Sequence, residues 1–549
     1  MLTGRSPWLA PVLLGCLALA VRLPNLDHAA QFDELYHFFA AQSWLAEGQL
    51  RVADGVYNRT PLFTIFLAQW LGLFGENLVV TRLPSLIAGT GLVVLVFLWT
   101  RAVAGSLAAV LAALLLALDP EHLQISQWGR FYALHCLLFW LGAIGTYRLV
   151  TAPPPTLSRS MLLAAGVVIC FGVALYLQMT TLIGLLGVAV WSVVALGVPW
   201  PARFSLRARW VIAAGAVLVG GAAIWVFVET GLVAELARYR STPLYMAENR
   251  NAFWYYHSFL IVYYPTLWPL TALAVVIGLA YRPRPTAFCA SVVAVAFVLH
   301  SFAAPKSMRY LTYAAPFLFV LWGIAIAEVW PRLRRVLEDV GTRALAWLRL
   351  GRLGRPGVYA ALALVLVFTV VANGALVRTA ATMFDFVIPP MKRQADWAAA
   401  REVIAPWLTD AAIVLTTNEL SALYYLGRYD VLISKSRLSE YGDGGEFSID
   451  PRTGRPVIGT PESLALIMDC YSSGLIVADN SRWRNPAQVD GAVAQLIQAR
   501  AEEVELPAAA MHAYAWRQPD DTRRAEACAN LPAGMADGVM AGVERGHAP

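Results

Sequence analysis

Long apolar segments constrain this chain more strongly than any other feature of its sequence. A window of roughly 17 to 22 apolar residues is long enough to cross the hydrocarbon core of a bilayer as a helix. Such windows predict about eleven transmembrane helices, at residues 8–26, 83–100, 103–119, 131–147, 160–178, 180–198, 210–229, 258–280, 287–304, 311–329 and 357–376. The composition agrees, because 58% of the 549 residues are hydrophobic and only 14% are charged, whereas about a quarter are charged in soluble domains. The sequence therefore predicts an α-helical polytopic membrane protein.

Basic residues in the short loops predict the orientation in the membrane. Cytoplasmic loops of membrane proteins are enriched in Lys and Arg. In this chain the loops on one side of the predicted spans contain Arg101, Arg148, Arg159, Arg203, Arg207, Arg209, Arg282, Arg284 and seven arginines between residues 332 and 355. The N-terminus is therefore expected in the cytoplasm, and everything after residue 376 outside. The apolar stretch Pro61–Phe74 is too short to cross, so we expect it to form a helix along the outer surface.

The sequence changes character after the last predicted span. Short β-branched runs, such as Ala411–Thr417 and Gly474–Ala478, alternate with helical stretches, and this alternation predicts a small α/β domain. We therefore expect a transmembrane module at 1–376, with a structured first outer loop at 27–82, and an extracytoplasmic α/β domain at 377–549.

The net charge and the cysteines narrow the class of protein. The net charge of +6 is modest, and no basic stripe with interleaved aromatic residues is present, so we expect no nucleic-acid partner. Of the six cysteines, only Cys470 and Cys528 lie in the polar C-terminal part. A disulfide between them would require an oxidising compartment. Nothing in the sequence indicates an oligomeric state.

Adjacent carboxylates and a histidine follow the first predicted span, in the stretch Gln31–His37. If Asp33 opens a helix, Asp33 and Glu34 both lie within one helical turn of His37. This spacing suits a general base, or a corner of a site for a divalent ion such as Mg, Mn, Ca or Zn. Because two or three ligands fall short of a full metal shell, the base is the favoured interpretation. Alternatively, Asp33 only caps a helix that runs to about Gly48.

Several basic residues lie on the predicted outer face, against the topology rule. Arg59, Arg130, Lys306 and Arg309 come from loops close to the spans, which suits binding of an anionic headgroup at the interface. The alternative is snorkelling, in which an arginine at a span end, such as Arg82, reaches the headgroups without a catalytic role. Further basic candidates on this face are Arg238, Arg240 and Arg250, and carboxylates recur on it at Asp54, Asp119, Glu121, Glu235 and Glu248. Acids beside bases suit a reaction in which a hydroxyl is deprotonated while a phosphate leaves.

Five short motifs occur in order along the membrane part of the chain. They are Phe32-Asp33-Glu34, Asn58-Arg59-Thr60-Pro61-Leu62-Phe63, Arg82-Leu83-Pro84-Ser85, Gln127-Trp128-Gly129-Arg130-Phe131-Tyr132-Ala133-Leu134 and Lys306-Ser307-Met308-Arg309-Tyr310-Leu311. In their order, and in their placement on one membrane face, they resemble the GT-C superfamily of membrane glycosyltransferases. The resemblance is to the family-39-like branch, which includes protein O-mannosyltransferases and the lipid A aminoarabinose transferase. It covers the chain to about residue 330.

The resemblance implies roles for particular residues. Asp33 would be the catalytic base, and Glu34 would help to orient the acceptor or a metal ion, with His37 as a further metal ligand on its spacing alone. Two positions that are often charged in the family are uncharged here, so Asp119 or Glu121 is expected to supply the second acid. The residues expected to bind the donor phosphate are Arg59, Arg130, Lys306 and Arg309, and those expected to bind substrate are Tyr132, Arg82 and Tyr310.

Together these observations predict a polyprenyl-phosphate-sugar-dependent hexosyl- or pentosyltransferase. It would transfer the sugar by an inverting displacement to a hydroxyl of a glycolipid, polysaccharide or protein, on the extracytoplasmic side of a bacterial inner membrane. The alternative is a transporter or flippase of a lipid-linked anionic substrate, which would need ionisable residues near the bilayer midplane. The middle portions of the predicted spans carry almost none, and this favours the enzyme.

Overall fold

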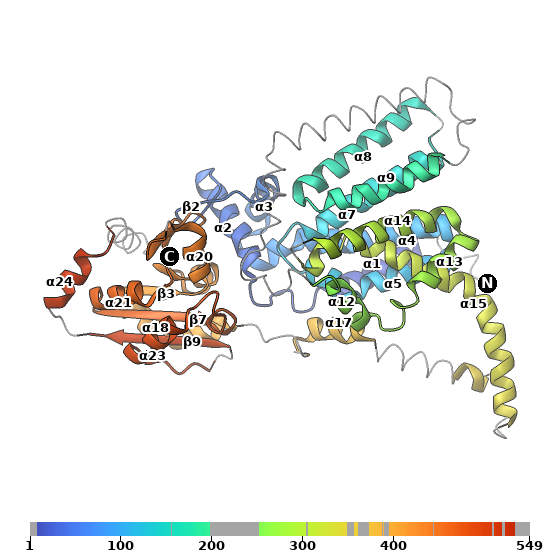
Figure 1. The fold of residues 1–549 in the computed structure, drawn as a ribbon. Coiled ribbons are helices and arrows are strands. Elements are labelled where there is room, and N and C mark those ends of the chain that lie inside the picture. The colour runs from blue at the N-terminus through green and yellow to red at the C-terminus, as the bar shows by residue number, and fades with distance from the viewer. Residues whose placement is uncertain are drawn as a thin grey trace. The chain divides into compact units, whose positions relative to one another are not determined.

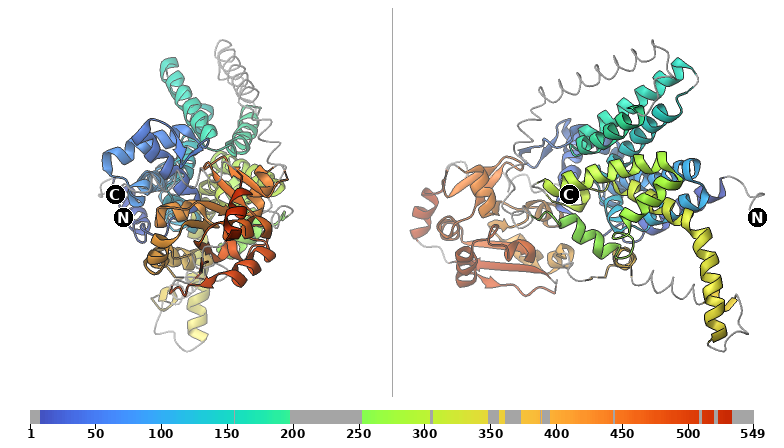
Figure 2. Two further views of the ribbon diagram at one scale, coloured as in Figure 1. Left: turned by 90° about the vertical axis from the view of Figure 1, so that its left-hand side faces the viewer. Right: turned by 45° about the vertical axis from the view of Figure 1, so that its right-hand side comes forward.

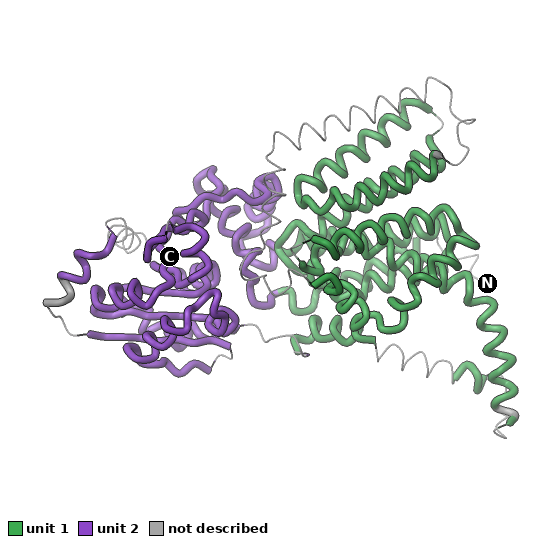
Figure 3. The backbone as a smooth tube through the Cα atoms, viewed as in Figure 1, with its two compact units in different colours: residues 1–26, 82–386 green, residues 27–81, 387–549 purple. Residues whose placement is uncertain are grey.

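The computed structural model describes most of the chain. The described residues are 8–154, 156–197, 252–303, 306–347, 356–360, 373–386, 388, 395–442, 444–507, 510–518 and 522–532. The predicted span 210–229 and most of 357–376 lie outside them, as do Arg238, Arg240, Arg250, Glu235 and Glu248. The chain divides into two compact units, which Figure 3 colours separately: unit 1 holds residues 1–26 and 82–386, and unit 2 holds residues 27–81 and 387–549.

Unit 1 consists of helices that run side by side (Figure 1), and Figure 2 shows them from two further directions. In chain order they are α1 (Leu9–Arg22), α4 (Leu78–Ala104), α5 (Ser106–Ala117), α6 (Pro120–Ser126), α7 (Tyr132–Thr151), α8 (Leu157–Leu177), α9 (Thr181–Gly197), α12 (Tyr255–Tyr263), α13 (Thr271–Tyr281), α14 (Pro283–Phe302), the 3-10 turn η3 (Met308–Tyr310), α15 (Ala315–Trp347) and α17 (Gly374–Phe384).

Five helices in the described part of the chain are long and apolar enough to cross a membrane, namely α4, α7, α8, α14 and α15. They become six if α5 and α6, which meet at a 61° bend, count as one span. Helices α1, α9 and α13 are apolar but shorter. Each of the five long helices overlaps a span predicted from the sequence. The prediction of a polytopic helical membrane protein is therefore confirmed.

One predicted span differs from the structure. Residues 258–280 hold the end of α12 and most of α13, with a break between Tyr263 and Thr271. Pro265 and Pro269 lie in this break, and proline cannot donate the backbone hydrogen bond that a continuous helix needs. The same physics applies at Pro120, which begins α6 after the bend that follows α5.

Small residues allow close packing within unit 1. Gly323 of α15 faces α5, and a Cβ atom added there would lie 2.6 Å from the carbonyl oxygen of Ala108. The alanines at 108, 109, 112 and 113 are all fully buried. Small side chains that let two helix backbones approach are typical of helix pairs in membranes.

Unit 2 combines residues 27–81, the segment predicted to be the first outer loop and called the outer loop below, with the C-terminal domain. The outer loop contributes α2 (Phe32–Glu47), β1 (Arg51–Val52), β2 (Gly55–Val56) and α3 (Pro61–Phe74). The C-terminal domain contributes α18 (Trp397–Asp410), β3 (Ile413–Thr416), α19 (Glu419–Ser421), the π-helical turn η5 (Ala422–Leu426), β4 (Val431–Ile433), α20 (Lys435–Tyr441), β5 (Phe447–Asp450), β6 (Arg455–Ile458), α21 (Pro461–Cys470), β7 (Ser473–Asp479), α22 (Asn480–Trp483), α23 (Gly491–Arg500), β8 (Glu502–Glu503), β9 (Met511–Arg517) and α24 (Thr522–Ala529).

The C-terminal domain is built on a seven-stranded sheet with the strand order β5-β6-β4-β3-β7-β9-β8. The central strands β6, β4, β3 and β7 are parallel, and β5, β9 and β8 pair antiparallel at the two edges. Successive residues of β3 enter two separate hydrophobic cores, one on each face of the sheet. The predicted strands and helices of an α/β domain are confirmed. Cys470 and Cys528 form a disulfide between α21 and α24.

Backbone hydrogen bonds join the outer loop to the turn between β5 and β6. The amide of Asp54 donates to the carbonyl oxygen of Thr453 at 3.0 Å, and the amide of Val56 donates to that of Pro451 at 2.9 Å. Between them, Gly55 lies so close that an added Cβ would be 2.2 Å from the backbone of Arg452. Only glycine fits this approach. The first outer loop and the C-terminal domain thus form one compact body.

Candidate functional site

The acid-rich stretch Gln31–His37 forms the first turn of α2. Gln31 is the N-cap, and the carboxylate of Glu34 accepts the Gln31 amide at 2.7 Å, which completes a capping box. The interpretation of Asp33 as the cap was therefore wrong, because the cap lies two residues earlier and Glu34 is its partner. The predicted end of the helix at Gly48 is confirmed, with Gly48 in the left-handed conformation at φ 68°.

Asp33 faces the predicted phosphate-binding residue Arg59. A guanidinium nitrogen of Arg59 lies 3.3 Å from a carboxylate oxygen of Asp33, and the guanidinium also lies 5.2 Å from the centre of the Tyr36 ring. The Asp33 side chain is 26% exposed, so it is accessible to a substrate. Arg59 can therefore help to hold the carboxylate in one orientation.

His37 has partners of its own. The Tyr57 hydroxyl lies 2.6 Å from His37 Nδ1, and the Thr64 hydroxyl lies 3.0 Å from the same nitrogen. Both His37 and Thr64 are almost fully buried. This cluster ties α2 to α3, which makes His37 a structural residue of the outer loop.

The predicted metal ligands do not converge. Among the described residues, no three His, Cys, Asp or Glu side chains gather in a way that could hold a metal ion. Glu34 accepts a backbone amide, Asp33 faces Arg59, and His37 Nδ1 lies against two hydroxyls. These three side chains do not fit a common metal shell.

In unit 1, two predicted phosphate-binding arginines share one aromatic ring. The guanidinium carbon of Arg130 lies 4.7 Å from the centre of the Tyr132 ring, and that of Arg309 lies 5.7 Å from the same centre. Arg309 also lies 5.4 Å from the ring of Tyr310. The backbone carbonyl of Arg130 accepts from the Ser85 hydroxyl at 2.6 Å, so the motif Arg82-Leu83-Pro84-Ser85 supports this pair. The structure thus brings together four residues predicted from the sequence, namely Arg130, Tyr132, Arg309 and Tyr310.

Lys306, the third predicted phosphate ligand in unit 1, has a different setting. Its ammonium group donates to the carbonyl oxygens of Ser301 at 2.8 Å and His300 at 3.4 Å, and to that of Ala303. These carbonyls belong to the C-terminal end of α14, where a cation is favourable. Burial lowers the pKa of Lys306. Its three protons are therefore directed at the helix end.

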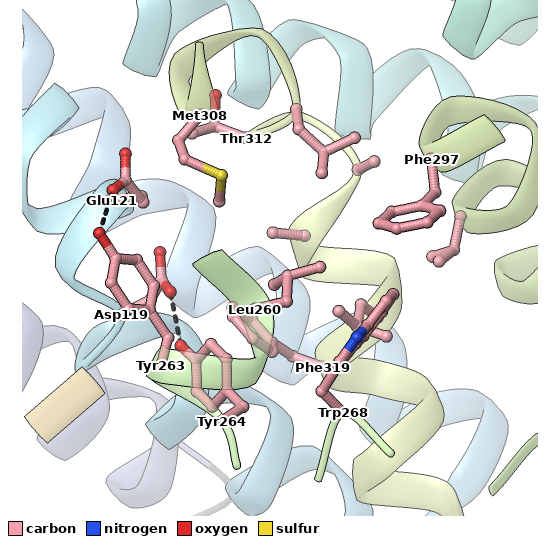
Figure 4. Close-up of a pocket in the computed structure, with 15 residues that line it drawn as sticks. Asp119, Glu121, Leu260, Tyr263, Tyr264, Trp268, Phe297, Met308, Thr312 and Phe319 are labelled. Carbon is pink, nitrogen blue, oxygen red and sulfur yellow. Dashed lines mark hydrogen bonds between the residues drawn. The ribbon is translucent and has the colours of Figure 1, made fainter. Parts of the chain in front are cut away.

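Asp119 and Glu121, the candidates for the second acid, each pair with a tyrosine. The Tyr264 hydroxyl donates to Asp119 at 2.5 Å, and the Tyr263 hydroxyl donates to Glu121 at 2.8 Å, as Figure 4 shows. Asp119 also accepts the backbone amide of His122 at 2.9 Å and so caps α6. The four residues line a mostly apolar cavity of about 30 Å³, which has room for one or two water molecules.

Two further arginines of unit 1 are fully buried. Arg82 is fully buried and donates to the carbonyl oxygen of Leu26 at 2.6 Å, a structural role close to a span end. Arg22, which was not a candidate, is also fully buried at the end of α1 and donates to Ser126 at 3.2 Å and to the carbonyl oxygen of Ala117 at 3.2 Å. The position of Arg22 inside the predicted span 8–26 was the feature of the sequence that could have identified it. Tyr263 and Tyr264 had no signal beyond their place in an aromatic-rich segment.

Comparisons with known proteins agree with this fold. No family model matches the sequence. No curated protein matches it either. Among solved structures, ArnT from Cupriavidus metallidurans in the apo state superposes with a TM-score of 0.58 at 15% identity, covering 93% of this chain and 99% of that chain. ArnT bound to undecaprenyl phosphate gives a TM-score of 0.56 at 14% identity, covering 94% and 100%.

A third neighbour is the oligosaccharyltransferase of Archaeoglobus fulgidus in its apo form. It gives a TM-score of 0.52 at 12% identity, covering 92% of this chain and 75% of that chain. ArnT and the oligosaccharyltransferase are both GT-C proteins, and the resemblance seen in the sequence motifs is thus confirmed at the level of fold. The chain is a multi-pass membrane protein with the fold of the GT-C membrane glycosyltransferases.

Proposed function

We propose that the chain is an integral membrane glycosyltransferase that uses a polyprenyl-phosphate-linked sugar as donor. In the reaction, the bond between sugar C1 and the phosphate oxygen breaks, and a bond between C1 and an acceptor hydroxyl oxygen forms on the opposite face of C1. The acceptor proton goes to a carboxylate, and the polyprenyl phosphate leaves with the electron pair. The fold supports this reaction class, since one ArnT structure of the same fold was solved with undecaprenyl phosphate.

The observation that carries the proposal is the arginine pair on Tyr132. Two guanidinium groups repel each other, and an anion that both can contact relieves this repulsion. Arginine binds phosphate oxygens through parallel N–H donors. A phosphate has more oxygens than a carboxylate, so it is the better ligand for two arginines at once. Arg130 is 5% exposed, and charge interactions are stronger where water is scarce. As C1 separates from the phosphate, negative charge grows on the oxygen that these donors stabilise.

We assign the proton acceptor to Asp33. Its carboxylate is partly exposed and oriented by Arg59. It lies in the first turn of α2, where the free amides of the helix end favour a negative charge. Glu34 supports the reaction by fixing that first turn through the capping box.

The donor site in this proposal depends on Arg130 and Arg309 more than on Lys306. Lys306 would have to leave three backbone carbonyls before it could reach a phosphate. Its present contacts instead order the segment that precedes Arg309. Asp119 or Glu121 is proposed as the second acid.

The disulfide supports an extracytoplasmic site. Disulfides persist in oxidising compartments such as the bacterial periplasm and are rare in the cytosol. The Cys470–Cys528 bond lies in unit 2, which also holds Asp33. We therefore propose that transfer occurs on the outer side of the bacterial inner membrane.

Binding of undecaprenyl phosphate to the purified full-length protein tests the donor site. Arg130→Gln and Arg309→Gln should each weaken binding about tenfold or more, since each removes charge-assisted hydrogen bonds to the anion. Arg101→Gln, at the exposed end of α4, is the matched control and should bind as the unmodified protein does. Equal affinity in all three variants would contradict the proposal.

A further inference from the structure

The strand order of the C-terminal domain defines a place where such folds usually bind ligands. After β3 the next three strands of the chain, β4, β5 and β6, all lie on one side of β3, whereas β7 lies on its other side. In open α/β sheets, ligands lie beyond the carboxyl ends of the strands at the point where the strand order reverses. Here that point lies between β3 and β7. The residues that follow these two strands include Asn418 and Glu419 after β3, and Arg482 after β7.

The chain's own Phe32 lies against two arginines, Arg482 just after the carboxyl end of β7 and Arg452 in the turn that precedes β6. The guanidinium carbon of Arg482 lies 4.8 Å from the centre of the Phe32 ring, and that of Arg452 lies 5.8 Å from the same centre. Phe32 is the first residue of α2, immediately before Asp33. A cation within about 6 Å of an aromatic ring is attracted to it. Both arginines therefore contact the residue that begins the helix of the proposed catalytic base.

Buried carboxylates hold the two arginines in place. One oxygen of Glu419 lies 2.6 Å from Arg452, and its other oxygen lies 3.1 Å from Arg482. Asp450, which is fully buried, forms two further bonds with Arg452, at 3.0 Å and 2.5 Å. Glu419 is 1% exposed. The two guanidinium groups are thus fixed by a network that leaves little freedom to turn.

The electrostatics agree with a tightly coupled network. Burial alone would raise the pKa of Glu419, but the positive charges of Arg452 and Arg482 outweigh it and lower that pKa. A further contact anchors the same end of the helix, because the amide of Ala30 donates to the Tyr425 hydroxyl at 2.9 Å. The C-terminal domain therefore holds the chain immediately before and at the start of α2.

We propose that Glu419, Arg452 and Arg482 form a clamp on Phe32 that positions Asp33 for catalysis. Glu419 and Arg482 lie where open α/β sheets usually bind a ligand, and here, together with Arg452 of the β5–β6 turn, they hold the helix of the proposed base. This gives the C-terminal domain a role in the reaction without contact with substrate. The three residues are positioning residues, and the link to catalysis rests on the proposed glycosyl transfer.

Hydrogen exchange in the full-length protein tests the clamp directly. In Arg482→Ala, the amides of Glu34 and Leu35, which bond to the Gln31 carbonyl, should exchange about tenfold faster, since the first turn opens more often. Arg500→Ala removes an exposed ion pair with Asp469 in the same domain and is the matched control. It should leave the first turn of α2 unchanged.

Transfer kinetics test the consequence for catalysis. Arg482→Ala should lower kcat about tenfold or more, because small displacements of a catalytic group are costly, while KM for the acceptor stays nearly constant. Arg482→Lys should recover part of kcat, since it keeps a cation near the ring. Phe32→Leu disrupts the same contact by removing the aromatic ring, and it leaves both arginines in place. The double variant Phe32→Leu with Arg482→Ala should be little worse than either single variant.

The outcomes separate the clamp from the proposed function. Unchanged exchange at Glu34 and Leu35 in both Arg482→Ala and Phe32→Leu would overturn the clamp. The clamp would also be overturned if the effects of Arg482→Ala and Phe32→Leu on kcat were simply additive in the double variant. Faster exchange in a protein whose transfer is unaffected by Asp33→Asn would support the clamp and overturn the assignment of the base.

Discussion

Replacement of Asp33 by asparagine should separate catalysis from folding. The change keeps the size of the side chain and removes its ability to accept a proton. A positioned general base contributes typically 10²- to 10⁴-fold to a rate, which corresponds to about 3–5 kcal/mol of activation free energy. The ion pair with Arg59 is largely exposed, with side chains 45% and 26% exposed, and such pairs contribute about 0–1 kcal/mol to folding after solvent screening. The rate should therefore fall by orders of magnitude while the unfolding free energy barely changes.

The assay follows sugar transfer in membranes that contain the native lipid-linked sugars. Mass spectrometry of the lipid-linked donors and of the glycans would show the donor accumulating and the product missing in Asp33→Asn. Asp54→Asn is the matched control, because Asp54 lies in the same loop, is 59% exposed and is 3.9 Å from Arg455. Near-normal transfer by Asp33→Asn, at equal protein abundance, would refute the assignment of the base.

Three further predictions concern unit 2. The Cys470–Cys528 disulfide closes a loop with a sequence separation of 58, and removing it should destabilise the C-terminal domain by about 4 kcal/mol on the loop-entropy relation. Protease resistance of that domain, compared with and without reductant, measures the loss of stability. Equal resistance in the two conditions would contradict the prediction. Because the folded-state pKa of Glu419 lies below its usual 4.5, the stabilisation is fully present above that pH and is lost as the pH falls through the lowered pKa. Hydrogen exchange of β3 at pH 6 and pH 4 should show this loss, and Glu419→Gln should reduce the difference. A cysteine at the exposed position Glu446 should react with an impermeant thiol reagent in cells whose outer membrane alone is permeable, and protection until the inner membrane is opened would reverse the topology.

Much of the helical architecture follows from local sequence. The apolar stretch Pro61–Phe74 matches α3 in both bounds, since proline favours the first turn of a helix and Gly75 follows its end. The five long apolar helices also coincide with predicted spans. The interval 258–280 differed because hydrophobicity counts ignore the two prolines that break it. Length and hydropathy therefore predict the spans, and backbone chemistry corrects their continuity.

The candidate site was predictable in part. Motif order singled out Arg130, Arg309 and Tyr132, and the structure places them together. Sequence spacing put Asp33, Glu34 and His37 on one helix but could not show that each has different partners. The contacts of Phe32 with Arg452 and Arg482 join residues more than 400 positions apart, and no local pattern encodes them. Such long-range pairs depend on the tertiary fold alone.

The division of unit 2 into two distant chain segments has a consequence for biogenesis. Thr81 ends the first segment and Val387 begins the second, so about 300 residues must be synthesised between them, which takes roughly 15–60 s at ordinary translation rates. During this interval the β5–β6 turn, to which the β1–β2 hairpin bonds, does not yet exist. Arg452 and Arg482, which contact Phe32, are also still missing. Residues 27–81 must therefore persist without these partners until the second segment, which begins at Val387, has been synthesised. If Asp33 is the proposed base, the helix that holds it would become ordered only once the C-terminal domain folds, and transfer would not begin before then.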